Sequence, residues 1–172
     1  PLDELADEID VYEGYEGDEA GITTTFCQKD GVPVWEARVL KSHVKDCASC
    51  LAKLWDMRNA KFIVANRIVA RPDYIFMYDE NGERITQTSG SDIRPISITD
   101  RTGRRSAVKI VQYVLRPRFE FDLIVLNDDM VTEKMLRDIF TYGGLIKGMG
   151  QDRTIGFGKY KYTLEKAEAK QG

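Results

Sequence analysis

The stretch GGLIKGMGQDRTIGFGKYKY, residues 143–162, determines how the rest of the chain is interpreted. It holds six of the chain's fourteen glycines together with three lysines, one arginine and several aromatic residues. Glycine lets a backbone approach a phosphate closely and present its N–H groups, while lysine and arginine neutralise phosphate charge and release counterions. Glycines also allow a loop to pack tightly over a core. The stretch therefore has a ligand-contacting and a purely structural interpretation.

A helix is predicted before this stretch and a strand within its end. Thr132 is a suitable N-cap, and Glu133 lies in the first turn, where the helix dipole favours a negative charge. Gly143 and Gly144 are predicted to end the helix. Residues 157–165, FGKYKYTLE, alternate apolar and polar side chains like a final strand. The apolar spacing predicts a buried helix face of Met135, Leu136, Ile139 and Phe140.

The upstream sequence predicts further elements. A helix over 35–57 is indicated by apolar residues with the spacing of one buried face. These residues are Leu40, Val44, Cys47, Leu51 and Leu54. The Asn-Gly signal in 80–83 predicts a tight turn, and residues 84–105 are polar and rich in turn formers. Strands are predicted from β-branched content and alternation at 22–28, 61–69, 73–79, 106–115 and 118–126.

This order of elements is βαββαβ with an inserted β-hairpin, which is the ferredoxin-like, or RRM-like, arrangement of an α+β fold. At 172 residues and 42% hydrophobic content, the chain is expected to form one ordinary core. We expect an acidic arm at 1–20, one domain at 21–165 with its insertion at 84–105, and a polar tail at 166–172.

The net charge of −3 conceals two opposite parts of the chain. Residues 1–20 carry nine acidic and no basic residues, so the other residues hold all 25 basic residues against 19 acidic ones. Such a balance suits a nucleic-acid partner for the domain. The arm has three interpretations. It is a solvated segment, a cover for a basic groove on its own or a neighbouring protomer, or a mimic of nucleic acid that blocks another protein.

A second basic cluster lies in IRPISITDRTGRRSAVK, residues 93–109. Its Thr-Gly turn is surrounded by Arg94, Arg101, Arg104, Arg105 and Lys109. Arginines at a hairpin tip suit phosphate clamping and base stacking, although a charged hairpin can also be simply solvated. Four aromatic residues in or beside the glycine-rich stretch are candidates for stacking on bases. They are Tyr142, Phe157, Tyr160 and Tyr162.

The segment GMGQDRTIGFGKY, residues 148–160, resembles the glycine-rich loop of the RAMP superfamily, the repeat-associated proteins of CRISPR ribonucleoproteins. The matching positions are Gly148, Gly150, Arg153, Gly156, Gly158 and Lys159. VPVWEARVLKSHVKDC, residues 32–47, is similar to the start of the first RAMP helix. The resemblance covers about residues 21–165. It is closest to stand-alone relatives of the CRISPR backbone subunits, of a kind also found in phage genomes.

The resemblance implies an RRM-like core that binds single-stranded nucleic acid without catalysis, as a scaffold or filament-forming subunit of a CRISPR-like or phage ribonucleoprotein. RNA is favoured over DNA, and a single-stranded DNA-binding or annealing protein is the alternative. The basic residues that we expect to contact nucleic acid are Lys41, Lys45, Arg94, Arg101, Arg104, Arg105, Lys147, Arg153 and Lys159. The glycines that we expect to contact it are Gly148, Gly150, Gly156 and Gly158.

His43 gives a further alternative, an RNA-processing endoribonuclease. Processing ribonucleases of the same superfamily use a histidine in the first helix as general base, and cleavage through the 2′-hydroxyl needs such a base. Its position between Lys41 and Lys45 fits an exposed helical face, where we find no partner for it. The expectation is therefore a non-catalytic protein.

We expect no metal and no cofactor. Cys47 and Cys50 form a CxxC, but a zinc site needs about four ligands, and the chain offers three thiols and one histidine. The pair falls inside a predicted helix, so these thiols are interpreted as small core residues. No apolar run is long enough to span a bilayer, and no signal peptide opens the chain. We expect a cytoplasmic protein of a prokaryotic or phage-infected cell, without a membrane partner.

Overall fold

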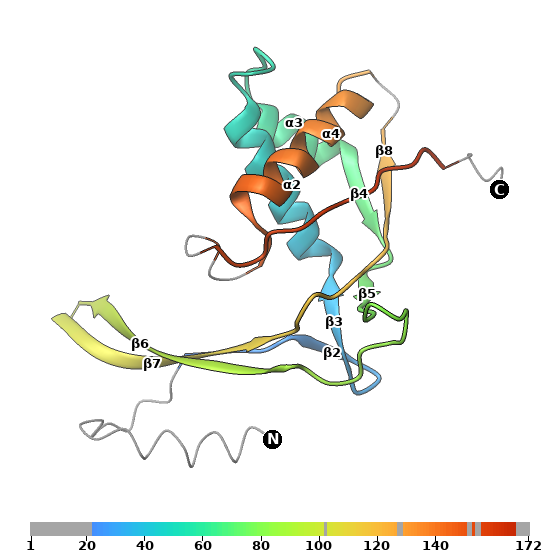
Figure 1. Cartoon of the computed structure of the whole chain (residues 1–172). Coiled ribbons are helices and arrows are strands. Elements are labelled where there is room, and N and C mark those ends of the chain that lie inside the picture. The colour runs from blue at the N-terminus through green and yellow to red at the C-terminus, as the bar shows by residue number, and fades with distance from the viewer. Residues whose placement is uncertain (1–21, 102, 127–128, 151–152, 154–155, 168–172) are drawn as a thin grey trace.

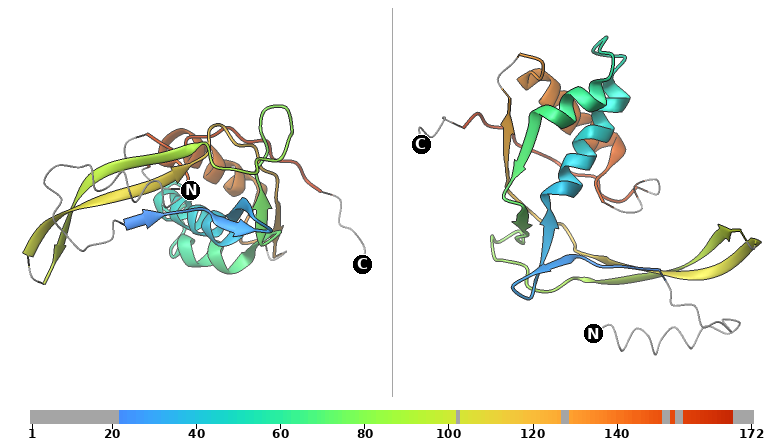
Figure 2. Two further views of the ribbon diagram at one scale, coloured as in Figure 1. Left: turned by 90° about the horizontal axis from the view of Figure 1, so that it is seen from below. Right: turned by 180° about the vertical axis from the view of Figure 1, so that it is seen from behind.

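A computed structural model of the protein (Figure 1) describes residues 22–167 apart from 102, 127–128, 151–152 and 154–155. The fold is α+β, as predicted. The helices α2, α3 and α4 lie together, and a long two-stranded hairpin extends away from them (Figures 1 and 2). The predicted acidic arm at 1–20 and residues 168–172 of the predicted tail lie outside the described residues.

The first helix is shorter than predicted. Strand β3, Val32–Glu36, leads directly into helix α2, Ala37–Leu51, so the first residues of the predicted 35–57 helix belong to a strand. Beyond Leu51 the chain turns, and Asp56 and Asn59 adopt left-handed backbone angles that a helix does not accommodate. Leu54 is therefore exposed, whereas the other four members of the predicted face are buried.

The strand predicted at 61–69 is wrong. Residues Ala60–Arg67 form helix α3, and strand β4, Ile68–Arg71, begins only after it. Ala60 and Val64, one helical turn apart, are both fully buried, and α3 packs against α2. A short apolar run suits a strand or a helix equally in sequence, and here the packing against α2 decides.

The described strands form three sheets, and the long strands β6 and β7 share one of them with a short strand. Strand β1, Ile22–Thr24, and strand β2, Cys27–Lys29, divide the predicted 22–28 strand, and β3 lies between β2 and β5, Tyr74–Phe76. Strand β8, Asp122–Val125, pairs antiparallel with β4 and is shorter than the predicted 118–126 strand. The single sheet of a ferredoxin-like fold is not confirmed among the described strands and stays a prediction.

The inserted hairpin is longer than predicted and lies further along the chain. Strands β6, Gly90–Asp100, and β7, Gly103–Tyr113, pair along their whole length, so the hairpin takes up most of the predicted 106–115 strand. The predicted boundaries of 84–105 are thus corrected to 90–113. The tight turn at 80–83 is confirmed by the bridge between Tyr78 and Arg84 on either side of it.

The second predicted helix is confirmed as α4, Glu133–Tyr142. The Thr132 hydroxyl accepts a hydrogen bond from the Met135 N–H at 3.3 Å, which is the predicted N-cap, and the predicted apolar face is buried. The expected stop at Gly143 and Gly144 is wrong, because a π-helical turn, η1, Gly143–Lys147, continues α4. Gly148, with a φ of 73°, ends it.

The strand predicted at 157–165 is also wrong, although the alternation of apolar and polar residues in this segment matches an alternation of half-buried and exposed side chains. Tyr160, Tyr162 and Leu164 are half-buried against the core and the residues between them are exposed, but the segment forms no strand pairing with the other described residues. The Tyr160 N–H donates to the Gly144 carbonyl at 3.3 Å. Packing of alternate side chains on the helices thus replaces pairing in a sheet.

Among the described residues, no helix combines the length and the apolar character that crossing a bilayer requires.

Candidate nucleic-acid interface

The glycine-rich loop, defined here as residues 148–159, is closed at its base by two of its own glycines. The Met149 N–H donates to the Gly158 carbonyl at 2.8 Å. A Cβ added to Gly158 would lie 1.9 Å from the Met149 carbonyl oxygen, and one added to Gly148 would lie 2.5 Å from that of Phe157. The backbone segments that enter and leave the loop therefore touch, so Gly148 and Gly158 serve the architecture of the loop.

The two inner glycines differ from this pair. A Cβ on Gly150 would lie 3.1 Å from the Trp35 ring, whereas a Cβ on Gly156 would meet nothing within 4 Å. Gly156 has a φ of 98° and is exposed. Among the predicted glycines, only Gly156 combines exposure with open space around its α-carbon, so it is the position where a ligand's phosphate can approach the backbone.

The three predicted cations of this region lie around the loop. Arg153 Nη1 is 3.7 Å from Asp46 Oδ2 of α2, an ion pair that ties the loop to the first helix. Lys147 ends η1 and is half-buried. Lys159 is exposed and donates to the Ile146 carbonyl. Exposed or half-exposed cations beside an open glycine suit the phosphates of a nucleic acid.

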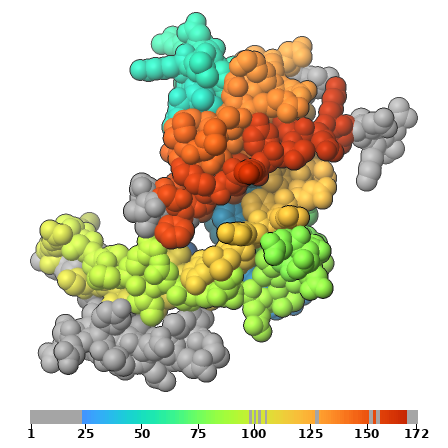
Figure 3. Space-filling view, in the orientation of Figure 1, coloured from blue at the N-terminus to red at the C-terminus, as the bar shows by residue number. Residues whose placement is uncertain are grey.

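Phe157 is the one member of the predicted stacking set that the structure leaves exposed. Its exposed fraction is 55%, and the Arg94 guanidinium lies over its ring, 5.4 Å from the centroid. Arg94 belongs to β6 and is itself bonded to Asp92, so this contact joins the glycine-rich loop to the base of the hairpin. In Figure 3 the orange-red segment that follows α4 reaches from the helices to the hairpin.

The three tyrosines of the predicted stacking set have structural contacts instead. Tyr162 donates a hydrogen bond to the Arg137 carbonyl at 3.1 Å and packs against Phe140. Tyr160 is half-buried beside His43, and burial raises the pKa of its hydroxyl. Tyr142 is half-buried and packs against the core. Half-buried rings held in this way do not offer a free face to a base.

Apart from Arg94, the predicted arginines of the hairpin lie at its end remote from the loop. Arg101 and Arg104 are exposed, and Arg104 Nε donates to Ser97 Oγ at 2.9 Å across the hairpin. The backbone places Arg105 next along β7, opposite Ile98. Figure 2 shows the hairpin curving away from the helical body, so this cluster and the glycine-rich loop form two separate basic regions.

The two predicted helix cations lie on α2. Lys41 is exposed and Lys45 is half-buried. Asp46, which follows Lys45, holds Arg153 of the loop. This ion pair places the glycine-rich loop next to α2, the helix that carries Lys41 and Lys45.

The expected exposure of His43 is wrong. His43 is only 3% exposed, its Nε2 shares a hydrogen bond of 2.8 Å with the Tyr160 hydroxyl, and it touches Cys47 Sγ. Burial, reinforced by the positive charge of Arg153, lowers the pKa of His43 to about 4. A buried imidazole of such low basicity does not suit a general base for an RNA hydroxyl. His43 instead joins α2 to the C-terminal segment.

The two thiols of the CxxC, Cys47 and Cys50, lie in different surroundings. Cys47 is buried, and burial raises the pKa of its thiol to about 12, so a thiolate is disfavoured. Cys50 is exposed, which corrects the expectation that both thiols lie in the core. The described residues contain no group of three His, Cys, Asp or Glu side chains that could hold a metal ion.

Trp35 is a residue of this region that sequence reasoning missed. Its ring stacks on Phe119 with centroids 5.8 Å apart and also lies against Gly150 of the loop. Its indole Nε1 is buried and has no acceptor among the described residues. A buried donor generally has a partner, so this N–H is an exception among the described residues. The sequence feature that could have indicated Trp35 is its place as an aromatic residue just before α2, the helix that the loop contacts.

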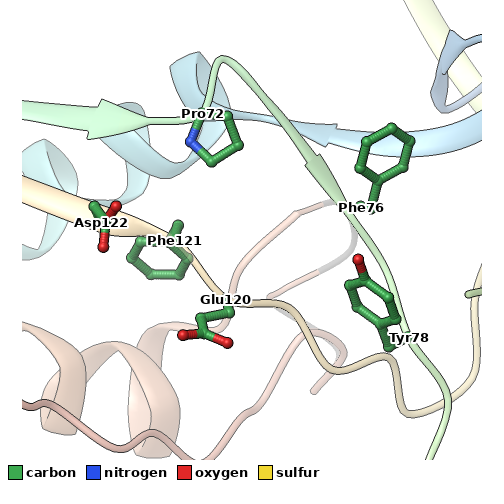
Figure 4. A pocket seen from close by; sticks show the side chains of 6 residues that line it. All are labelled: Pro72, Phe76, Tyr78, Glu120, Phe121 and Asp122. Carbon is green, nitrogen blue, oxygen red and sulfur yellow. The ribbon is translucent and has the colours of Figure 1, made fainter. Parts of the chain in front are cut away.

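A separate cavity of about 360 Å³ lies between β5 and the segment that leads into β8 (Figure 4). Phe76 and Tyr78 line one side, and Glu120, Phe121 and Asp122 line the other. The two carboxylates would repel phosphate, so this cavity is not part of the basic interface.

No protein-family model matches the sequence, and a search of curated proteins finds no significant match.

Proposed function

We propose that the protein binds single-stranded nucleic acid, with RNA favoured over DNA, through its glycine-rich loop and its basic hairpin. The observation that supports this most is the exposed Phe157 ring, which Arg94 orients at the point where loop and hairpin meet. Stacking of bases on aromatic rings, combined with cations along the backbone, is how proteins bind single strands with little sequence preference.

The proposal includes a role as a scaffold rather than a catalyst. The buried position and low pKa of His43 give no support to the endoribonuclease alternative. The resemblance to RAMP proteins of the glycine-rich loop favours a subunit of a CRISPR-like or phage ribonucleoprotein with a ferredoxin-like core. The antiparallel pairing of β4 with β8, on either side of the inserted hairpin, is compatible with the antiparallel second and third strands of such a core.

We expect Phe157→Ala to weaken binding of single-stranded RNA by about 1–3 kcal/mol, which is roughly a fivefold to 150-fold rise in Kd. The reason is the loss of the exposed stacking face. Fluorescence anisotropy with a labelled oligonucleotide measures the change.

The matched control for this substitution is Leu145→Ala. Leu145 is another large apolar residue, 73% exposed on the neighbouring η1, but it has no aromatic face. Equal losses in both variants would show that general apolar contact matters rather than stacking, and an unchanged Kd for Phe157→Ala would remove the ring from the interface.

We expect the double variant Arg104→Ala with Arg105→Ala to weaken binding and to reduce the salt dependence. Each phosphate contact contributes about one unit to the slope of log K against log salt concentration, so the slope should fall by about two units. Titrations at several salt concentrations measure it. A slope equal to that of the unmodified protein would exclude these arginines from phosphate contact.

The same titration with single-stranded DNA tests the choice of nucleic acid. Stronger binding of DNA than of RNA by the unmodified protein would favour the single-stranded DNA-binding alternative.

A further inference from the structure

The direction of strand β1 relative to β7 defines which part of the hairpin the N-terminal end of β1 faces. It pairs parallel to β7, with Ile22 opposite Lys109 and Thr24 opposite Val111. Because the two strands run in the same direction, moving backwards from Ile22 corresponds to moving along β7 from Lys109 towards Gly103. The N-terminal end of β1 therefore faces the tip of the hairpin.

The edge of β7 along this course has no partner strand among the described residues. On its other side β7 pairs with β6 from Gly103 to Tyr113, but β1 covers only Lys109–Val111. The N–H and C=O groups that point away from β6 between Gly103 and Val108 thus form an open sheet edge. An open edge accepts a further extended segment through backbone hydrogen bonds.

The charges on the two sides are complementary. The segment before Ile22 contains Glu16, Asp18 and Glu19 and no basic residue, whereas the end of the hairpin carries Arg101, Arg104 and Arg105. If the β1–β7 register continues, Asp18 lies opposite Arg105 and Glu16 lies opposite Gly103, beside the tip. Opposite charges on neighbouring strands stabilise their pairing.

We propose that residues 16–21 extend β1 along the open edge of β7 and place their carboxylates against the hairpin arginines. The acidic arm then occupies the same cations that nucleic acid needs, so it is an intramolecular competitor. This competition rests on the function proposed above, whereas the strand contact itself does not.

The contact is tested without nucleic acid, in the full-length chain. Three acidic residues near β1 are neutralised in the near variant, E16Q/D18N/E19Q, and three distant ones in the control variant, D3N/E4Q/D7N. Both variants change the net charge equally. Amide hydrogen exchange is measured for the β7 residues 103–108 whose N–H groups point away from β6.

We expect these amides to be protected in the unmodified protein and in the control variant. In the near variant they should exchange faster by about tenfold, because the edge opens when the charge attraction is removed. Rapid exchange in the unmodified protein would overturn the proposal. Protection that disappears on dilution would assign the contact to the arm of a second copy and would overturn the intramolecular form.

The competition is tested by binding of a labelled single-stranded RNA at low salt. The near variant should bind on the order of tenfold more tightly than the unmodified protein, and the control variant should show a clearly smaller change. Equal gains in both variants would attribute the effect to net charge and overturn the competition. If no variant binds RNA while the exchange pattern is as expected, the proposed function fails and the strand contact stands.

Discussion

Replacing Gly158 with alanine is expected to lower the free energy of unfolding by about 3 kcal/mol or more. Two causes combine. Gly158 has a φ of 74°, which strains any residue with a Cβ, and its added Cβ would lie 1.9 Å from the Met149 carbonyl oxygen. A backbone atom cannot move aside as a flexible side chain can, so the base of the loop must separate. Urea unfolding followed by circular dichroism measures the loss.

Gly156→Ala is the matched control for this variant. Gly156 also has a positive φ, of 98°, but a Cβ there meets nothing within 4 Å. Only the backbone strain applies, and the expected loss is about 1–2 kcal/mol. If the two variants unfold at the same urea concentration, the close contact at the base of the loop does not exist and the division of the glycines into architectural and ligand-facing positions is incorrect.

The protein is expected to lose stability as the pH falls from about 6.5 to about 4, owing to His43. Burial lowers the pKa of His43 to about 4 in the folded protein, below its ordinary value of 6.5. The unfolded chain therefore takes up the proton first, and unfolding becomes more favourable as the pH falls through this range. The full shift corresponds to a loss of about 3 kcal/mol.

The His43→Gln variant separates this effect from the titration of carboxylates. Glutamine has no titratable group, so the variant should show a shallower pH dependence than the unmodified protein between pH about 6.5 and about 4, even though it is less stable at neutral pH. The measurement is the free energy of unfolding at several pH values for both proteins. Parallel curves would contradict the burial of a neutral imidazole at this position.

The sequence predicts well those features that depend on interactions between residues close together in the chain. The Thr132 cap and the buried face of α4 follow from local hydrogen bonding and from spacing, and both are confirmed. His43 carries the same kind of signal. It lies three residues after Leu40 and four before Cys47, which places it on the buried face of α2.

Other features depend on contacts that sequence does not reveal. The segment that forms α3 has the composition of a strand, and only its packing on α2 makes it helical. In the sequence Gly143 predicts the end of a helix. In the structure a Cβ added to Gly143 would lie 2.2 Å from the hydroxyl of Tyr160, 17 residues further along the chain. Glycine here permits close packing of the C-terminal segment rather than a change of direction.

The candidate interface shows the same division. The sequence indicates which residue types gather in the glycine-rich loop, but it does not distinguish the four predicted loop glycines from one another. The structure separates Gly148 and Gly158, which close the loop, from Gly156, which is open. Burial likewise separates Tyr160 and Tyr162 from Phe157, which lies three residues before Tyr160 and so falls in the other set of alternate positions.

The central claim, binding of single strands at the loop and hairpin, is tested most directly by one titration. Labelled single-stranded RNA is mixed at low salt with the unmodified protein and with the E16Q/D18N/E19Q variant, and anisotropy is recorded, with double-stranded RNA as the competitor. We expect saturable binding that weakens steeply with salt and that the duplex displaces poorly. Absence of binding to both proteins at low salt, or equal competition by the duplex, would contradict the claim.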